Sequence, residues 1–247
     1  MRHTAMGDRA PPSFPTPFQS WRASQVALER RLQVTLQIHP DNFLFNRIRS
    51  WLATWRRIRA NPVVLSWLSS GVRVRWADGR PPAPFHIREY HITHAEQTAW
   101  HELKHRYLRT GAIRPARDRR YVSAAFLRPK KDGGMRLVID LRHLNNHCAK
   151  SSCSYETLAS LRELIEPGDW MVSFDVQDAF HHIGIAASDR KFFTFGIDGE
   201  LWECNVIPFG WTASPMLFTK MMRQVIRFLR SPQETVPAFP PLSLIHI

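Results

Sequence analysis

A two-residue turn signal in the second half of the chain constrains the fold most strongly. Asp198-Gly199 lies between residues 191–197 and residues 200–206, both rich in apolar and aromatic side chains. An Asp-Gly pair between two such runs is typical of a β-hairpin, because the tight turn requires positive φ angles that these residues tolerate. The chain is therefore expected to build at least part of a β-sheet.

Other patterns predict further strands. Residues 121–128 and 135–141 are expected to form a second hairpin around a lysine- and glycine-rich turn, Lys130–Gly134. Trp170–Phe174 is a short apolar run that is expected to form a strand. Residues 72–76 alternate between apolar and charged side chains, like an exposed strand.

Helical patterns lie between and after these strands. Thr93 and Glu96 have capping-box spacing and predict a helix over about 94–110, which Gly111 ends. Strands mixed with helices indicate an α/β (α+β) fold. Other helices are predicted over residues 43–59 (basic and amphipathic), over Leu158–Ile165, and from Ser214 as N-cap with Pro215 at the first helical position.

Composition divides the chain into four parts. Residues 1–20, rich in Pro, Ser and Thr, are expected to be a disordered lead-in. Residues 21–86 form a basic N-terminal extension that ends in the proline-rich linker 79–86. Residues 87–230 hold the hairpins and most helices, and residues 231–247 are expected to be a non-native or unstructured tail.

The positive charge is concentrated in the first half of the chain. Residues 1–120 hold 21 Lys and Arg against 8 Asp and Glu, whereas residues 121–247 hold 13 of each. Such a field favours a polyanion through counterion release and guanidinium–phosphate contacts. Nucleic acid is the expected partner, although an acidic membrane surface or a ribosomal or chromatin role would fit the charge equally well.

Two carboxylates follow the predicted apolar strand. Asp175 is expected at the strand's carboxyl end, where sheets present functional groups, and Asp178 lies three residues later where the chain turns. Phosphoryl transfer needs metal ions held in line with phosphates, and polymerases hold two Mg²⁺ ions with several carboxylates. By itself the pattern is weak, because surface acids that end a strand are far commoner than metal ligands.

The order of three segments adds specificity. Phe126–Asn145 (F-L-R-P-K-K-D-G-G-M-R-L-V-I-D-L-R-H-L-N) comes first, the strand before Asp175 follows, and Ile207–Phe218 (I-P-F-G-W-T-A-S-P-M-L-F) comes last. From about residue 95 to 230 the chain resembles reverse transcriptases of retroelements. It covers their fingers motif, first palm motif and following nucleotide-binding motif. The stretch from Trp55 to Gly71 looks most like the region before the polymerase in DIRS-like, tyrosine-recombinase retrotransposons.

The resemblance implies a right-hand polymerase fold, with fingers and a partial palm preceded by the basic helical extension. It also implies RNA-directed DNA synthesis on an RNA template and DNA primer. Asp175, with the carbonyl of Val176, would hold the catalytic Mg²⁺ or Mn²⁺ ions. Lys130 and Arg136 would contact the triphosphate of the incoming dNTP. Asp178 and Ala179 would lie along its sugar and phosphates, and Phe180 would lie under the sugar, where it excludes a 2′-hydroxyl. Phe209 and Gly210 would lie near the nucleotide and the template base.

A basic stripe lies on the last predicted helix. Lys220, Arg223, Arg227 and Arg230 follow one another at steps of three and four residues, so they share one helix face. The stripe either contacts the template or is a solvated face, and both interpretations stay open.

The chain departs from the family pattern after this helix. The family's next element is a hairpin bearing aromatic-x-Asp-Asp, which supplies the remaining metal ligands, but the last aspartate here is Asp198. A lone Asp175 would not hold two divalent cations against their repulsion, so this polypeptide is expected to be a truncated form that does not polymerise. Leu242–Ile247 matches what a sequencing-library adapter would encode and is expected to be non-native.

Two alternatives remain open. His101-Glu-Leu-Lys-His105 matches the H-E-x-x-H zinc-protease signature, with Glu102 as general base. Lys104 between the ligands, and the lack of a following third ligand, weigh against this interpretation. The second alternative is a non-catalytic remnant that binds nucleic acid through its basic first half.

Cysteine use and hydropathy bear on the compartment. Cys148, Cys153 and Cys204 form no C-x-x-C pair, which favours a reduced intracellular compartment, cytoplasm or nucleus. No apolar run has the length of a membrane span, so no membrane partner is expected. We expect Cys148, Cys153 and the His181-His182 pair to be structural.

Overall fold

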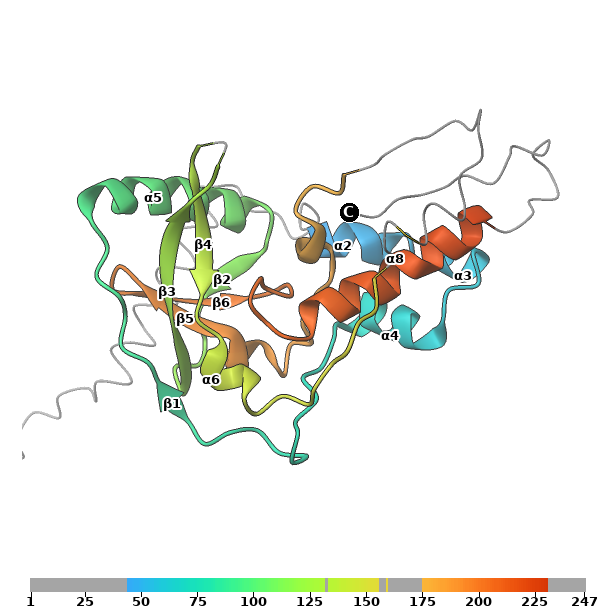
Figure 1. Ribbon diagram of the computed structural model, residues 1–247, viewed down its shortest axis with the longest axis horizontal. Coiled ribbons are helices and arrows are strands. Elements are labelled where there is room, and N and C mark those ends of the chain that lie inside the picture. The colour runs from blue at the N-terminus through green and yellow to red at the C-terminus, as the bar shows by residue number, and fades with distance from the viewer. Residues whose placement is uncertain (1–43, 132, 156–158, 160–174, 231–247) are drawn as a thin grey trace, which may run out of the picture.

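The computed structural model describes residues 44–131, 133–155, 159 and 175–230. Figure 1 shows a β-sheet with helices α5 and α6 at one end of the molecule and helices α2, α3, α4 and α8 gathered at the other. The mixed α/β fold predicted from the sequence is confirmed. In the described part of the chain, no helix combines the length and apolar character needed to span a membrane.

The sheet has six strands in the order β1-β3-β5-β6-β2, with β4 pairing to β3 off this path. The strands are β1 (Phe85–His86), β2 (Ile113–Pro115), β3 (Tyr121–Pro129), β4 (Met135–Ile139), β5 (Thr194–Ile197) and β6 (Glu200–Cys204).

Strand β3 changes partners along its length. Its first half pairs in parallel with β1 and β5, where Val122 lies opposite Thr194. Its second half pairs antiparallel with β4, where Ala125 lies opposite Ile139. The β3–β4 hairpin therefore extends beyond the rest of the sheet, and it carries the lysine- and glycine-rich turn at its tip.

Six α-helices and two 3₁₀ helices are described: α2 (Leu44–Ser50), α3 (Leu52–Arg57), α4 (Pro62–Ser70), α5 (His94–Arg109), α6 (Arg142–Asn145), α8 (Ser214–Arg230), η2 (Ala179–His182) and η3 (Arg190–Phe193). Helix α5 begins with the predicted capping box. The Thr93 N–H donates to the Glu96 carboxylate at 2.8 Å, and the Glu96 N–H donates to the Thr93 hydroxyl at 3.3 Å.

Helix α5 is fastened to the β5–β6 hairpin. Lys104 forms an ion pair with Glu200 at 2.8 Å, and Gln97 donates a hydrogen bond to Asp198 at 3.0 Å. Asp198 has φ +54 and Gly199 φ +70, as the predicted Asp-Gly turn requires.

One hydrophobic core joins both ends of the molecule. Trp100 of α5 packs edge-on against Trp202 of β6, with ring centroids 6.3 Å apart. Val64 of α4 and Leu217 of α8 belong to the same buried cluster. The helices of the N-terminal extension thus share a core with the sheet, and their burial fixes the position of α8.

Several predicted boundaries were wrong. The expected helix over residues 43–59 is two helices, α2 and α3, interrupted at the exposed Trp51, which has φ −97 and ψ 17. Ile48, Leu52 and Trp55 keep helical spacing across the break and pack against the core, so the apolar face continues.

The segment 72–76 is not an exposed strand. Val72 and Val74 are buried, and only isolated bridges form, from Val72 to Ile185 and from Trp76 to Cys148. The alternating pattern indicates that one side of the segment is buried. A non-strand segment that packs between other elements gives the same pattern.

Two other boundaries differ from the prediction, and a third agrees. The last two residues of the expected linker form β1, and residues 190–193 form η3, so β5 starts at Thr194. Helix α8 begins at Ser214 as expected, but the Ser214 hydroxyl donates to the carbonyl of Pro208 at 2.7 Å. The predicted helix over 158–165 (apart from Ala159), the strand Trp170–Phe174 and both termini lie outside the described residues.

Candidate functional site

The segment from Asp175 to Phe180 contains the predicted metal and nucleotide residues. Asp175 is exposed and Val176 is half-buried. Since the strand expected before Asp175 lies outside the described residues, its position at a strand end stays a prediction. Asp178 has φ +50 and ψ +41, a left-handed conformation in which the chain turns into η2.

Arg106 of α5 holds the Asp178 side chain. Its Nη2 donates to both carboxylate oxygens, at 2.6 and 2.7 Å. The hydrogen bond to Asp178 raises the pKa of Arg106, so the guanidinium stays charged. The Asp178 carbonyl accepts from the His181 N–H at 2.7 Å, which fixes the start of η2.

The half-buried Tyr107 and the buried His181 lie next to this ion pair. Their rings meet edge-on with centroids 5.4 Å apart. Burial lowers the pKa of His181 to about 4, although the negative charge of Asp178 opposes this effect. Burial raises the pKa of Tyr107, while the charges of Arg106 and Arg136 lower it. Arg136 and Asp178, predicted from separate motifs, thus both act electrostatically on one phenol.

Phe180 and Phe209 were also predicted from separate motifs, and the structure brings them together. Their ring centroids are 4.6 Å apart, and Phe218 of α8 packs edge-on against Phe180 at 5.8 Å. Phe180 is half-buried, whereas Phe209 is 52% exposed. The pair therefore presents an aromatic surface at the start of η2, beside Ala179. The cavity bounded in part by Tyr107, His181 and Phe209 measures only about 30 Å³.

Asn145 fixes the loop that carries Phe209, and the sequence interpretation assigned it no role. Its side-chain amide donates to the Gly210 carbonyl at 2.8 Å, and its side-chain oxygen accepts from the Thr212 N–H at 3.1 Å. Gly210 has φ +92, and a Cβ there would lie 3.2 Å from the Ile139 carbonyl. This position therefore requires glycine.

The tip of the β3–β4 hairpin is strongly cationic. The Lys130 N–H donates to the Gly134 carbonyl at 3.1 Å and closes the turn. Arg136 is exposed and lies directly opposite Arg128 across the two strands. Like charges in that position repel, so an anion bound at the tip would relieve the repulsion. Arg128 is a further candidate for contact with an anion. The sequence could have suggested it, because Arg128 and Arg136 are placed symmetrically about the predicted turn.

The basic stripe on α8 divides into two kinds of residue. Arg223 donates to the Ser154 carbonyl at 2.7 Å, and Arg227 donates to the Arg59 carbonyl at 2.7 Å. Both arginines therefore hold α8 against neighbouring segments. Lys220 is exposed, and its ammonium has no hydrogen bond to another described residue.

The zinc-protease signature does not assemble a metal site among the residues that the structure describes. His101 and His105 lie on one face of α5 with ring centroids 4.7 Å apart. Burial lowers the pKa of His105, which favours a neutral imidazole. Yet no group of at least three His, Cys, Asp or Glu side chains that could hold a metal ion occurs in the described ranges.

Two of the three cysteines have local hydrogen-bond partners. The buried Cys148 thiol donates to the Leu144 carbonyl at 3.4 Å, and burial raises the pKa of both Cys148 and Cys204. Cys153 is half-buried, with its thiol 3.9 Å from the Ser154 carbonyl. All three are free thiols.

Comparison with known proteins adds independent information. Residues 128–239 match the family model described as reverse transcriptase (RNA-dependent DNA polymerase). The chain is 27% identical over 176 residues to a Gag-Pro-Pol polyprotein of sheep pulmonary adenomatosis virus, covering 68% of the chain and 10% of the polyprotein. It is 27% identical over 114 residues to a putative enzymatic polyprotein of Cassava vein mosaic virus, covering 44% and 18%. It is 23% identical over 140 residues to the Transposon Tf2-3 polyprotein of Schizosaccharomyces pombe, covering 57% and 10%.

Solved structures give the same fold. A native prototype foamy virus protease–reverse transcriptase superposes with a TM-score of 0.51 at 18% identity, over 64% of this chain and 21% of that one. The selenomethionine-labelled CSH mutant of that protein gives a TM-score of 0.55 at 15% identity, over 88% and 28%. The chain thus spans a minor part of each of these relatives. At the family level the matches support a reverse transcriptase of a retroelement.

Proposed function

We propose, on the premise that residues 128–239 are reverse transcriptase sequence, that this chain supplies fingers and part of the palm to an RNA-directed DNA polymerase. The observation that carries the proposal is the contact between Phe180 and Phe209, centroids 4.6 Å apart, from segments that the resemblance assigns to one nucleotide pocket. The Asn145 bonds to the Phe209 loop support the same assignment, since they connect it to the fingers segment.

The exposed carboxylate of Asp175 and the carbonyl of Val176 are suited to a divalent cation. Mg²⁺ is commonly bound by one or two carboxylates together with substrate phosphates. The cation would neutralise charge on the triphosphate during phosphoryl transfer. Asp178 does not compete for it, because Arg106 occupies both of its carboxylate oxygens.

The remaining site residues have complementary roles in the proposal. Lys130 and Arg136 on the hairpin tip bind the triphosphate, with Arg136 suited to a forked contact. Asp178 and Ala179 contribute the wall along the sugar and phosphates. The ring of Phe180 lies under the sugar and leaves no room for a 2′-hydroxyl, so it selects deoxynucleotides. Phe209 and Gly210 lie beside the nucleotide and the template base, and the exposed face of Phe209 is available for that contact.

The proposal includes two finer statements. We place the parent element among DIRS-like retrotransposons, on the sequence from Trp55 to Gly71. We also propose that the 247-residue polypeptide, assayed alone, binds template and primer without extending the primer, because it contains no aromatic-x-Asp-Asp sequence. Further metal ligands would come from other parts of a longer polyprotein.

A dNTP-dependent binding experiment tests the assignment without requiring catalysis. The probe is a fluorescein-labelled DNA primer that ends in a dideoxynucleotide and is annealed to an RNA template. With Mg²⁺ present, the next complementary dNTP should raise the affinity of the chain for this duplex, whereas a non-complementary dNTP should not. Asp175→Asn and Arg136→Ala should each remove that increase. If complementary and non-complementary dNTPs act alike, the nucleotide pocket is wrongly assigned.

The second candidate function is a binding-only protein. The concentration of 21 Lys and Arg in residues 1–120 favours it. If the chain only binds nucleic acid, it should bind the same duplex with steep salt dependence, and no dNTP should change its affinity. The experiment above therefore separates the two candidates.

A further inference from the structure

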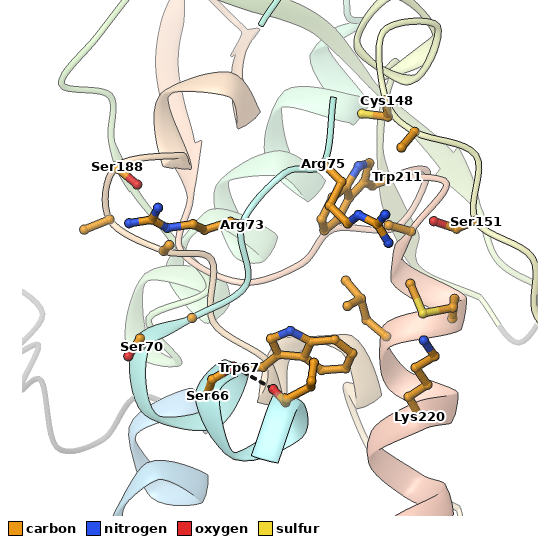
Figure 2. Close-up of a pocket in the computed structure, with 18 residues that line it drawn as sticks. Ser66, Trp67, Ser70, Arg73, Arg75, Cys148, Ser151, Ser188, Trp211 and Lys220 are labelled. Carbon is orange, nitrogen blue, oxygen red and sulfur yellow. Dashed lines mark hydrogen bonds between the residues drawn. The ribbon is translucent and has the colours of Figure 1, made fainter. Parts of the chain in front are cut away.

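A cavity of about 670 Å³ lies between α4, the segment that follows it, and α8 (Figure 2). Its walls come from five stretches of chain: α4, residues 71–75, residues 148–151, residues 186–188 and residues 211–220. The volume falls in the range typical of small-molecule and cofactor sites. None of the residues assigned above to metal, triphosphate or sugar lines it.

Among the described residues, three cations and no carboxylate line this cavity. They are Arg73, Arg75 and Lys220, whose side-chain nitrogens bond to no other residue in the described part of the chain. The nearby Asp189 does not line the cavity, and it accepts from the Val74 N–H at 2.8 Å and from the Ser188 hydroxyl at 2.6 Å. Three cations beside one nearby carboxylate leave an excess of positive charge, and a concave site concentrates the positive potential.

The wider sequence strengthens that potential. Between Asp41 and Asp78 the chain has seven arginines and no acid, and between Glu203 and Glu234 it has four cations and no acid. These two stretches supply α2, α3, α4 and α8, which lie together at one end of the molecule (Figure 1). An anionic ligand is therefore favoured over a neutral one.

Two indole rings form part of the walls. Figure 2 shows Trp67 on one side of the cavity, Arg75 and Trp211 on the opposite side, and Lys220 reaching in from α8. Trp67 is half-buried, so part of its ring remains accessible. Trp211 is only 3% exposed, and its indole N–H makes no hydrogen bond of normal geometry to a described residue. Aromatic faces next to cations are how proteins bind the bases and phosphates of single strands.

We propose that this cavity binds a nucleotide unit, with its phosphate between Arg75 and Lys220 and its base against Trp67. Arg73 points toward Ser188 (Figure 2), so it adds positive charge to the cavity wall. A simple inorganic anion would satisfy the cations but leave the aromatic wall uncovered. The nucleotide is either free or one unit of a single-stranded nucleic acid, since both present the same phosphate and base. The site goes beyond the proposed polymerase activity, because the N-terminal extension supplies one of its walls and it shares no ligand-binding residue with the Asp175 site.

Fluorescence anisotropy with the full 247-residue chain tests this inference. One probe is N-methylanthraniloyl-ATP, and the other is a fluorescein-labelled single-stranded RNA of about 12 nucleotides. The double variant Arg73→Ala/Arg75→Ala should weaken binding of the recognised probe about tenfold or more. The matched control Arg80→Ala/Arg88→Ala removes the same charge from exposed positions outside the cavity, and should weaken binding by less than about threefold. Trp67→Leu, checked for folding by circular dichroism, should also weaken binding.

Each outcome decides the matter. A specific loss for both probes supports a site for free nucleotides, and a specific loss for RNA alone supports a site for one unit of a strand. Equal weakening by the two arginine pairs, or no binding of either probe, overturns the proposal. If Trp67→Leu does not fold, the arginine pairs still decide. Lys130→Ala/Arg136→Ala should leave cavity binding intact, so failure of the polymerase assignment and failure of this site are distinguishable.

Discussion

Asp178 adopts a backbone conformation that most residues avoid, and its side chain explains how this is tolerated. Asp is among the few non-glycine residues that enter the left-handed region. Here the carboxylate is held by Arg106, 72 positions earlier in the chain. The turn that places Ala179 and Phe180 therefore depends on a residue of α5.

Replacing Arg106 tests this dependence. Arg106→Ala should lower the free energy of unfolding by about 1 kcal/mol, a modest value because the guanidinium is 39% exposed. Arg109→Ala, on an exposed position of the same helix, should change it by less than about 0.5 kcal/mol. Urea denaturation measures both. Equal effects of the two substitutions would mean that the ion pair does not stabilise the turn.

His181 gives the molecule a defined response to acid. Its pKa falls from 6.5 to about 4 because the ring is buried. Above pH 6.5 the ring is neutral in the folded and unfolded chain, so it adds no pH dependence. Below that value the unfolded chain binds the proton more readily, and stability falls until the pH reaches about 4, by on the order of 3 kcal/mol.

The corresponding variant is His181→Leu. Chemical denaturation between pH 6.5 and 4 should show a shallower loss of stability for this variant than for the parent chain. The exposed His91→Gln is the control and should retain the parent's slope. An unchanged slope in His181→Leu would show that other groups cause the acid sensitivity.

The loop between β6 and α8 is held by contacts distant in sequence. Asn145, at the end of α6, bonds to the loop on both sides of Trp211. Trp211 in turn packs edge-on against Phe193 at 5.0 Å. The loop that carries Phe209 is therefore held in place by Asn145, which connects the segment Phe126–Asn145 to the segment Ile207–Phe218.

Substitution of Asn145 should loosen this loop. Asn145→Ala removes a hydrogen-bond donor and acceptor and should cost about 1–3 kcal/mol of unfolding free energy. The neighbouring exposed Asn146→Ala serves as the control and should have little effect. Hydrogen exchange should also show faster exchange of the Thr212 amide in Asn145→Ala. Unchanged exchange at Thr212 would contradict the proposed tether.

Elements with strong local signals were predictable from the sequence. The capping box of α5 and the Asp-Gly turn between β5 and β6 appear where residue type alone placed them. The hydrogen bonds of Arg106 and Asn145 could not be predicted from the sequence, because their partners lie 72 and about 65 positions away in the chain. Only the folded sheet brings these residues together. The break at Trp51 was missed because the apolar spacing continues through it. The roles of Asp175 and the hairpin cations came from motif order, and they remain predictions.

Taken as one body, the chain is more integrated than its composition suggests. Val64 and Leu68 of the basic extension share a core with Trp202 of the sheet. Arg227 of α8 also bonds to the Arg59 carbonyl, and the Asn61 N–H donates to Gln224 at 3.0 Å. We therefore infer one cooperative unit over the described residues.

Cooperativity gives a direct prediction for the whole chain. Tryptophan fluorescence and far-ultraviolet circular dichroism should report the same urea midpoint, because both ends of the molecule unfold together. Removing residues 1–76 should expose the apolar faces of α8 and the sheet and should lead to aggregation. Two separated transitions, or a stable soluble truncated chain, would contradict this integration.

The central claim is that Asp175 binds a divalent cation next to a triphosphate held by the β3–β4 hairpin. Iron-mediated cleavage measures this most directly, because Fe²⁺ bound in place of Mg²⁺ cuts the backbone around its ligands when ascorbate and peroxide are added. With a dNTP present, the account predicts cuts next to Asp175 and at Lys130–Arg136, and their loss in Asp175→Asn. Cleavage elsewhere, or cleavage that persists in Asp175→Asn, would contradict it.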